Sequence, residues 1–564
     1  MNTLLVSRTV ALFPAGYAAH LTVQYFGGWV LPSLILSAYS AYAVWLLFTA
    51  ALRLLLRPLE PPRELPYREH WATREEVRTL LLPSGQEGRG VALAHHPAGL
   101  IGVRPGTGGQ SEMGHFLVSG PSRAGTGLHL VTNLLRWQGS AVTVDIKGEN
   151  YQKTAGHRQR FSRVRVLDPS GYGDRYDPFL ELGHTDEGLH AAALLILEPE
   201  QDKERIFAER AANALFAGML AARKLGRPTL AYLRELTALG LMGYVRQLHA
   251  LQDPQIRRAL VDFLGKTPEQ FSPEDMGSDR FLNSSWMNLV TRMRPLFSEG
   301  ILRMTSGSDF QAADLITGST SLYLIFKEST LRFTAKALQV IQLGMIDALI
   351  RYGDEGHVDS ASGSTPVIFF FDEAGRVPVP RLEDLVSTIA GRGMSAVIYV
   401  QSLSQLEGKY GREAAATIRD NCHTQMFYPP RDKATAEYIS EMTGEVTLVE
   451  VDESERVESD GFGTDKTRRE TFRQRPLITP AEVRQLPKGT VVVFAQDRPP
   501  IKAQRLEYYR YPWAKRIANL AAPKPEPLGG LGGLPLPTLA PEVELDKGQI
   551  KQRAKNIGGD EVEL

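Results

Sequence analysis

The chain has 564 residues, which is too long for a single core, so two or three domains are expected. Its formal net charge is +0 with 23% charged residues. A chain that binds nucleic acid through an overall basic surface is therefore excluded, and any such contact must come from local patches. The single Cys422 excludes a disulfide framework and is typical of a reducing compartment. The 12 histidines show no zinc-binding spacing.

The N-terminal region is apolar over a membrane-spanning length. No Asp, Glu, Lys or Arg occurs from Thr9 to Leu52, and Trp29 to Leu52 alone is long enough to cross a bilayer as a helix. Gly27-Gly28 suits a tight turn, and arginines flank both ends of the apolar region, which places both ends in the cytoplasm. We expect a multi-pass transmembrane hairpin over 1–57, with the bulk of the chain cytoplasmic. A single span preceded by an interfacial leader is the alternative.

The stretch from Gly114 to Asn150 predicts a strand, a Gly-rich turn, a helix and a second strand. This is the layout of a phosphate-binding loop, in which backbone N–H groups and a helix N-terminus face an anion. The full pattern is G-x-x-x-x-G-K-[ST]. Here the frame consists of Gly120, Pro121, Ser122, Arg123, Ala124 and Gly125, followed by Thr126 in place of the lysine and Gly127 in place of the hydroxyl residue. The loop is recognisable, but its usual cation is absent.

A second nucleotide motif follows the apolar run Val367 to Phe371. Five apolar residues in a row predict a strand that is buried on both faces. Asp372 and Glu373 stand at its end, where the first acid would hold Mg²⁺ and the second would polarise the attacking water.

Two further side chains have a role in such a site. Gln401 ends the predicted strand Ala396 to Val400, where a polar residue can sense the γ-phosphate or order the lytic water. Arg392 could be a finger that acts on a neighbouring subunit. The sequence around Arg392 is equally consistent with an arginine in a solvent-exposed loop.

Three further segments are distinguished by their sequence patterns. Helical periodicity without strand signals predicts an all-helical insertion over 229–306 within an α/β domain. The segment from Glu450 to Arg475 is charged and poor in apolar residues, which predicts a long mobile loop. The Pro- and Gly-rich tail over 521–564 is expected to be disordered.

Several segments together resemble the TraG/TraD-type coupling proteins of type IV secretion systems, which are related to the FtsK/HerA ATPases. The resemblance rests on GPSRAGTG, VDIKGENYQKTAG, FFFDEAGRVP, GRGMSAVIYVQSLSQLEGKYG, IRDNCHTQMFYPP, EMTG, WATREEVR and RPLITPAEV, in their order and spacing. It covers roughly Tyr67 to Tyr511.

The resemblance implies a bacterial inner-membrane, hexameric, RecA-like P-loop ATPase that uses ATP and Mg²⁺. Such proteins bring single-stranded DNA bound to a relaxase, or effector proteins, to the secretion channel. It implies that Gly120 to Gly127 form the phosphate loop and that Asp372 and Glu373 are the magnesium and water acids. Gln401 would be the sensor and Arg392 the trans arginine. The expected order is a hairpin (1–57), a linker and first part of the body (58–113), the nucleotide-binding domain in two parts (114–228 and 307–520) around the helical domain (229–306), and the tail (521–564).

The departure from the family pattern is Thr126, since the family has lysine at this position. Loss of one charge-assisted contact of this kind could remove on the order of 2–4 kcal/mol of transition-state stabilisation. Three explanations compete: Lys147 or Arg123 supplies the charge, the protein binds nucleotide without useful turnover, or the chain is a deliberate catalytic knockout. The second explanation leads to a different functional class, a membrane receptor or scaffold for secretion cargo.

Overall fold

The computed structural model of the protein describes residues 42–45, 69–83, 88, 90–104, 113–199, 204–356, 366–457, 464–495 and 497–530. The chain divides into one unit over Met1–Arg68 and a second over Glu69–Leu564. In the first unit only 42–45 are described, as helix, so the expected hairpin over 1–57 otherwise lies outside the described residues. Among the described residues, one helix, Leu331–Asp354, has the length and hydropathy of a membrane span, but 72% of its apolar window is buried inside the protein.

A twelve-stranded sheet is the centre of the second unit, in the order β2-β1-β14-β13-β10-β3-β9-β8-β4-β7-β5-β6. The strands are β1 (Val91–His96), β2 (Gly99–Val103), β3 (Phe116–Ser119), β4 (Ser140–Asp145), β5 (Arg163–Asp168), β6 (Tyr172–Gly173), β7 (Thr320–Ile325), β8 (Val367–Phe371), β9 (Met394–Val400), β10 (Thr424–Phe427), β13 (Thr490–Ala495) and β14 (Ile501–Arg505). The seven strands from β10 to β5 are parallel, and the flanking strands pair antiparallel. Strands of a parallel sheet covered on both faces are continuously apolar, and every residue of β8 is buried, as its sequence predicts.

The strand order sets which residues can meet at the carboxyl edge of the sheet. Strand β9 lies between β3, which leads into the Gly-rich loop, and β8, which ends in the acid pair. The register places Ser119 opposite Val400 and Phe371 opposite Ile398. The loop, Gln401 and the acids therefore emerge at the same edge of three adjacent strands, where ligands of open α/β sheets bind.

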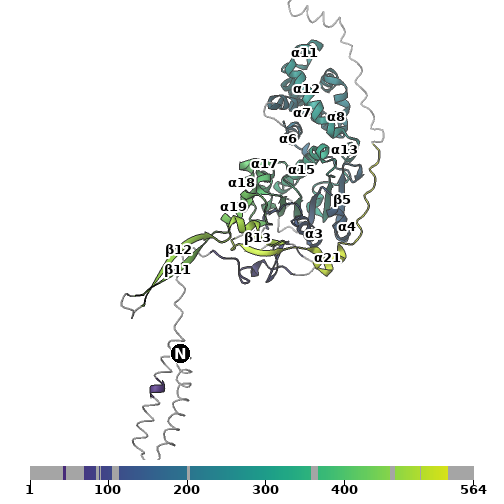
Figure 1. Cartoon of the computed structure of the whole chain (residues 1–564). Coiled ribbons are helices and arrows are strands. Elements are labelled where there is room, and N and C mark those ends of the chain that lie inside the picture. The colour runs from purple at the N-terminus through teal and green to yellow at the C-terminus, as the bar shows by residue number, and fades with distance from the viewer. Residues whose placement is uncertain are drawn as a thin grey trace, which may run out of the picture. The chain divides into compact units, whose positions relative to one another are not determined.

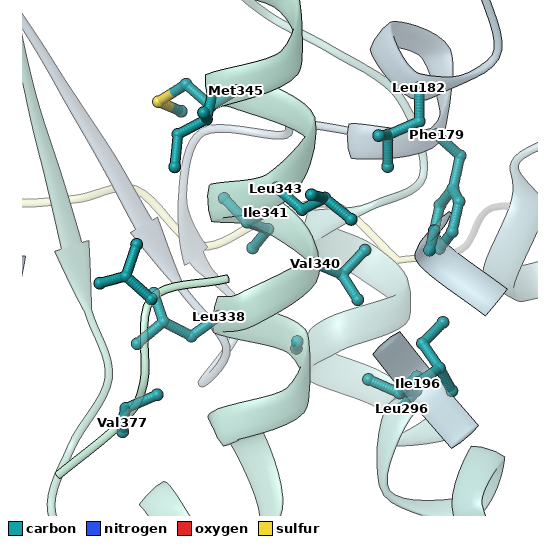
Figure 2. Close-up of a cluster of buried hydrophobic side chains, with 14 of the residues drawn as sticks. Phe179, Leu182, Ile196, Leu296, Leu338, Val340, Ile341, Leu343, Met345 and Val377 are labelled. Carbon is teal, nitrogen blue, oxygen red and sulfur yellow. The ribbon is translucent and has the colours of Figure 1, made fainter. Parts of the chain in front are cut away.

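Helices cover the sheet on both faces. Those outside the long helical segment are α3 (Thr126–Arg136), α4 (Glu149–Arg158), α15 (Leu331–Asp354), α16 (Leu382–Thr388), α17 (Leu403–Tyr410), α18 (Arg412–Asn421), α19 (Lys433–Met442), α20 (Pro480–Arg484) and α21 (Pro512–Ile517), with the short turns η1 (Arg78–Leu80), η6 (Ala390–Arg392) and η7 (Tyr508–Arg510). Helix α15 is apolar around most of its circumference. Figure 2 shows its side chains between Val377 on one side and Phe179, Leu182 and Ile196 on the other. Its apolar length is therefore explained by a central core position.

Between β6 and β7 the described chain is helical. The elements are α5 (Pro178–Leu182), α6 (Asp186–Leu197), α7 (Arg205–Leu225), α8 (Thr229–Ala238), α9 (Gly240–His249), α10 (Pro254–Leu264), η4 (Pro268–Gln270), α11 (Pro273–Ser278), α12 (Arg280–Met293), η5 (Arg294–Phe297), α13 (Glu299–Met304) and α14 (Asp314–Thr317). Figure 1 shows α7, α8, α11 and α12 grouped together.

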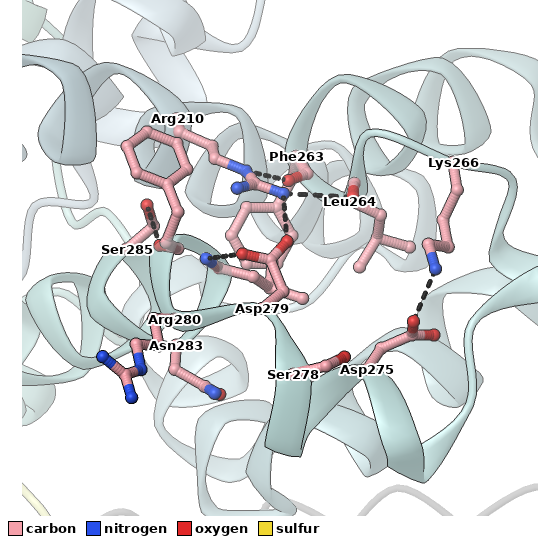
Figure 3. Close-up of polar contacts among 12 residues, drawn as sticks. Arg210, Phe263, Leu264, Lys266, Asp275, Ser278, Asp279, Arg280, Asn283 and Ser285 are labelled. Carbon is pink, nitrogen blue, oxygen red and sulfur yellow. Dashed lines mark hydrogen bonds and ion pairs between the residues drawn. The ribbon is translucent and has the colours of Figure 1, made fainter.

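Helix α7 packs with the helices that follow it, although the expected helical domain begins only at 229. On α7, Arg210 donates to the carbonyl oxygens of Phe263 (2.5 Å) and Leu264 (3.0 Å) at the end of α10. It also pairs with Asp279, the N-cap of α12, at 3.4 Å (Figure 3). The helical segment thus includes α7 and begins at Pro178.

Two segments differ from the sequence-based expectation. The region from Glu450 to Arg475 is not a loop throughout, because β11 (Glu445–Val457) and β12 (Thr464–Pro476) form an antiparallel hairpin separate from the main sheet (Figure 1). Its backbone register pairs Asp452 with Arg469 and Glu453 with Arg468. A charged strand pair of this kind lacks the apolar alternation by which strands are usually predicted.

The second difference is the start of the tail. Residues 521–530 lie against the body, where the Tyr151 hydroxyl donates to the carbonyl of Pro523 (2.5 Å) and the Leu528 amide donates to Gly171 (2.8 Å). Leu528 is buried in the main core cluster. The order in these ten residues comes from the Tyr151 side chain on α4 and from backbone groups at and just before β6, which composition does not reveal. Residues 531–564 lie outside the described part of the chain.

Candidate nucleotide site

The Gly-rich loop joins β3 to α3 in a compact turn. The amide of Gly120 donates to Val400 (3.0 Å), and the amide of Ala124 donates back to Pro121 (3.0 Å). Arg123 (φ 68°) and Gly125 (φ 122°) have positive φ, a backbone region that costs an L-residue free energy. This conformation leads directly into the N-terminus of α3 at Thr126. The geometry is that of a backbone anion cradle placed at a helix N-terminus.

Two side chains from distant segments support the loop. The hydroxyl of Tyr428 donates to the carbonyl of Gly125 (3.2 Å), and Nη1 of Arg505 donates to the carbonyl of Ala124 (2.8 Å). Arg505 is itself held by the buried carboxylate of Glu507 at 2.7 Å. Gly120 leaves room for this packing, since a Cβ there would stand 2.8 Å from the Tyr428 ring. The loop is therefore held in shape by side chains that the phosphate-loop motif does not contain.

Asp372 is half-buried directly after β8, beside a buried acid, Asp145. Burial raises the pKa of Asp372 to about 7, with further contributions from the charges of Glu373 and Asp145. Burial also raises the pKa of Asp145 to about 6, although the Tyr151 amide donates to this carboxylate at 2.8 Å. The side-chain amide of Asn150 lies 3.5 Å from an oxygen of each acid. Two carboxylates with one shared donor form a site that favours positive charge.

The donor set fits Mg²⁺ held together with a nucleotide. Within the described ranges, no group of three His, Cys, Asp or Glu residues is arranged to hold a metal ion by itself. Mg²⁺ does not require one, because it commonly takes one or two carboxylates, substrate phosphates and waters. Asp372, half-buried and lining the same cavity as the loop, is the residue that would hold it.

One cavity of about 550 Å³ brings the predicted residues together. Its walls include Gly120, Ser122, Arg123, Gly125, Thr126, Gly127, Lys147, Asp372, Glu373 and Gln401. Pro121 and Ala124 belong to the loop and do not line this cavity. The convergence of loop, acid pair and glutamine is the arrangement that phosphoryl transfer to water requires.

Arg392 lies elsewhere. It ends the short turn η6, donates to the carbonyl of Thr388 (2.7 Å) and forms an ion pair with Asp354 at the end of α15. It does not line the cavity of its own chain. An action on a neighbouring subunit stays a prediction.

Other cations line the same cavity as Thr126, which stands at the position of the absent lysine. Arg123 and Lys147, both considered from the sequence, line the cavity, and so do Lys153, Lys488 and Arg505. Lys147 is also close enough to Asp372 to lower the pKa of that acid through its charge. Lys147 is thus a cation of the cavity wall whose charge acts on Asp372.

Sequence reasoning missed several residues of the cavity wall. Asp145, Glu149 and Asn150 flank Lys147 in a charged turn of which the sequence predicts only the lysine as a site residue. Their position at a strand's carboxyl end was the available signal. Lys488, Arg505 and Tyr508 come from the last sheet hairpin and the turn after it, and no local pattern marks them as part of the site.

Known proteins are similar in sequence to this chain over most of its length. A family model described as type IV secretory system conjugative DNA transfer matches residues 71–528, which is more than half of the chain. Protein VirD4 of Rhizobium rhizogenes is 25% identical over 434 residues, which cover 74% of this chain and 62% of VirD4. The conjugal transfer protein TraG of Escherichia coli is 26% identical over 517 residues, covering 80% and 78%. The chain thus spans less than two thirds of that VirD4 protein.

Solved structures show the same fold. The bacterial conjugative coupling protein TrwB in an unbound form has a TM-score of 0.55 and 18% identity, covering 78% of this chain and 94% of that one. TrwB in complex with the non-hydrolysable GTP analogue GDPNP has a TM-score of 0.53 and 18% identity, covering 78% and 95%. The cavity at the carboxyl edge, the shared fold and the family match lead to one conclusion: the chain belongs to the type IV secretory system conjugative DNA transfer family.

Proposed function

We propose that this protein is an inner-membrane coupling protein of a conjugative type IV secretion system. It recruits single-stranded DNA carried by a relaxase, or an effector protein, and drives this cargo to the secretion channel with ATP. The observation that carries the proposal is the single cavity shared by the loop, Asp372, Glu373 and Gln401. The names of the relatives VirD4 and TraG and the nucleotide-analogue complex of TrwB support it.

In this proposal each part of the cavity has a chemical task. The loop amides and the N-terminus of α3 bind phosphate oxygens, and Asp372 holds Mg²⁺, which neutralises phosphate charge when bound. Glu373 and Gln401 orient the attacking water. Lys147 supplies the positive charge that Thr126 cannot, because it lines the cavity and influences Asp372.

The proposed assembly is a homo-hexamer anchored by the N-terminal hairpin. The family match supports it, and a trans role for Arg392 would require release of its pair with Asp354. The helical segment between β6 and β7 is proposed to recognise cargo. Cross-linking of detergent-solubilised protein, followed by mass determination, tests the hexamer.

A second candidate function comes from Thr126. Without the loop lysine the protein would be a nucleotide-binding receptor or scaffold that presents cargo and leaves energy to a partner ATPase. The specific observation in its favour is that the N-terminus of α3 carries a neutral hydroxyl residue at the lysine position. Under this alternative, nucleotide binds and turnover is negligible.

One experiment separates these functions. Binding of a fluorescent ATP analogue and phosphate release are measured, with and without single-stranded DNA, for the native chain, Thr126→Lys and the double variant Asp372→Asn/Glu373→Gln. DNA-stimulated hydrolysis by the native chain, lost in the double variant, supports the motor. Binding without hydrolysis in the native chain, together with hydrolysis in Thr126→Lys, supports the receptor. Absence of nucleotide and DNA binding in the native chain and in Thr126→Lys overturns both.

Cargo transfer in cells provides an independent comparison. A donor strain that carries the double variant Asp372→Asn/Glu373→Gln loses transfer if this chain is the motor. It retains transfer if the chain is a receptor. A donor with Lys433→Met, a change at an exposed lysine paired with Glu437 at 3.2 Å, is the matched control.

A further inference from the structure

Arg376, an arginine to which no role is assigned from the sequence, lies between two carboxylates beside the cavity. Nη2 of Arg376 is 2.6 Å from Oε1 of Glu328, and its Nη1 is 3.3 Å from Oε2 of Glu373. The fork of one guanidinium thus reaches two acids from different loops. Glu328 follows β7, and Glu373 follows β8. Arg376 joins these two loops at the carboxyl edge of the sheet.

The backbone around Glu373 is tightly turned. Glu373 has a φ of 55°, and the amide of Arg376 donates to the Glu373 carbonyl at 2.7 Å. A left-handed conformation at a residue other than glycine costs of order 1 kcal/mol or more and persists where surrounding contacts impose it. The turn directs the Glu373 side chain to the cavity wall and brings the arginine back to that same side chain.

The other acid is fixed by the loop that carries Lys147. The amide of Glu328 donates to the carbonyl of Ile146 at 3.1 Å, and the amide of Phe326 donates to Asp145 at 3.3 Å. The charge of Lys147 lowers the pKa of Glu328, after the larger effects of Arg376. Four side chains of alternating charge therefore follow one another at this end of the cavity: Lys147, Glu328, Arg376 and Glu373.

Arg376 itself is outside the cavity. Glu373 lines it, whereas Arg376 is not part of the wall, so the arginine can act on a bound nucleotide only through its partners. Its contact with Oε2 leaves Oε1 of Glu373 as the acceptor for a water. The shorter contact with Glu328 keeps the cation shared, which prevents a full bidentate pair with Glu373.

We propose that Arg376 is a positioning residue for Glu373, and that Glu328 holds Arg376 in place for this task. The inference rests on the proposed ATPase function. In it, the Glu328–Arg376 pair fixes the direction of the Glu373 carboxylate, so that the attacking water is held in one orientation. Small displacements of such a group reduce turnover about 10²-fold in other enzymes.

The first test separates turnover from binding. We expect Arg376→Gln to lower kcat for ATP about 10–100-fold and to leave the Kd for a fluorescent ATP analogue within about twofold, because Arg376 does not touch the cavity. Arg376→Lys restores part of the loss, since it keeps the charge without the fork. The matched control is Arg381→Gln, which removes an exposed arginine paired with an acid three residues away, Asp384, at 2.8 Å. Equal kcat values for Arg376→Gln and Arg381→Gln overturn the proposal.

The second test does not depend on hydrolysis. Cys422 is the single cysteine of the chain and is buried, so Glu373→Cys introduces the one reactive thiol. Its alkylation by iodoacetamide is followed as a function of pH, because a neighbouring cation favours the reactive thiolate. Adding Arg376→Gln should move the midpoint of this profile up by about one pH unit. Adding Glu328→Gln should lower the pH midpoint, because Arg376 then interacts with residue 373 alone.

The two tests distinguish failure of the proposed function from failure of the positioning role of Arg376. If the native chain hydrolyses no ATP but the thiol profile moves as expected, the proposed function fails and the positioning of residue 373 by Arg376 stands. If the profile of Glu373→Cys is unchanged by Arg376→Gln, the inference is overturned whatever the hydrolysis rate.

Discussion

The side-chain amide of Asn150 donates to the carboxylate of Asp372 at 3.5 Å, across 222 positions of sequence. Asn150 lies at the start of α4 and Asp372 follows β8, so the contact joins two segments of the cavity wall. The same amide nitrogen is 3.5 Å from Asp145. Asn150 therefore orients the residue that is proposed to hold Mg²⁺.

This contact predicts the effect of Asn150→Ala on metal affinity. Partners that orient a metal ligand typically contribute 10–100-fold to metal affinity. Because the hydrogen bonds here are long, we expect the Mg²⁺ concentration for half-maximal ATP binding to rise by about tenfold, with a smaller change in metal-free nucleotide binding. A titration of Mg²⁺ against a fluorescent ATP analogue measures it. An unchanged Mg²⁺ requirement would show that Asp372 does not depend on Asn150.

Replacement of two glycines of the same loop by alanine should have opposite effects on the stability of the protein. In Gly120→Ala the added Cβ would lie 2.8 Å from Cδ2 of Tyr428, so either the ring or the loop must move. We expect a loss of stability of about 1–3 kcal/mol and at least a tenfold loss of ATP affinity. In Gly127→Ala the Cβ meets nothing within 4 Å and sits in the first turn of α3, so stability should stay equal or rise by up to about 1 kcal/mol. Thermal unfolding of both variants provides the comparison.

The parts of the site that the sequence predicts are those with local signals. The apolar run Val367 to Phe371 predicts a buried strand, and the structure confirms one over the same residues. The glycine spacing from Gly120 to Gly127 predicts a turn before a helix, and α3 begins at Thr126 within it. Short-range periodicity and glycine placement are sufficient for these features because they depend on neighbouring residues.

The features that sequence does not predict depend on long-range contacts. Arg158 lies in a basic run of the sequence, yet it is fully buried and donates to the carbonyls of Leu134, Trp137 and Gly139 at 2.7–2.9 Å. Arginine side chains are rarely fully buried, whereas this one satisfies carbonyl groups at the end of α3. Arg376 and Arg505 are similar cases, since each pairs with a residue in a loop that is distant in sequence.

Lys147→Met tests whether this lysine replaces the loop cation. A charge-assisted hydrogen bond to phosphate contributes about 1.5–3 kcal/mol, so we expect ATP to bind about 10–100-fold more weakly. Lys433→Met is the control, because Lys433 is 81% exposed and pairs only with a surface acid. Its ATP affinity should match the native value. If Lys147→Met binds ATP normally, then Arg123, Lys153 or Lys488 is the relevant cation.

The carboxylate of Asp177, in the helical segment, should make the free energy of unfolding depend on pH. It is buried and caps α5, and burial raises its pKa from 3.8 to about 7, against the opposing effect of the Phe179 amide. Between these two values the folded protein binds more protons than the unfolded chain. This group therefore lowers the free energy of unfolding as pH rises from about 4 to about 7.

Asp177→Asn should remove that dependence, since the amide oxygen can still accept from Phe179 and carries no charge. The difference in melting temperature between this variant and the native chain should grow from pH 5 to pH 7 and stay constant above it. At pH 8 the variant should be the more stable by on the order of 1–3 kcal/mol. A difference that does not change with pH would contradict the assignment.

The long helical segment leaves the sheet and returns to it at nearly the same point. Arg175 precedes α5 and pairs with Asp309 beyond α13 at 2.6 Å, and the amide of Asp177 donates to the hydroxyl of Ser308 at 3.0 Å. Because these contacts hold its two ends together, the helical segment can act as an exchangeable unit. Helices can be lengthened, lost or replaced between its two ends without altering the register of β5 and β7. Under the proposed function, the helices that recognise cargo can thus change while the nucleotide cavity stays the same.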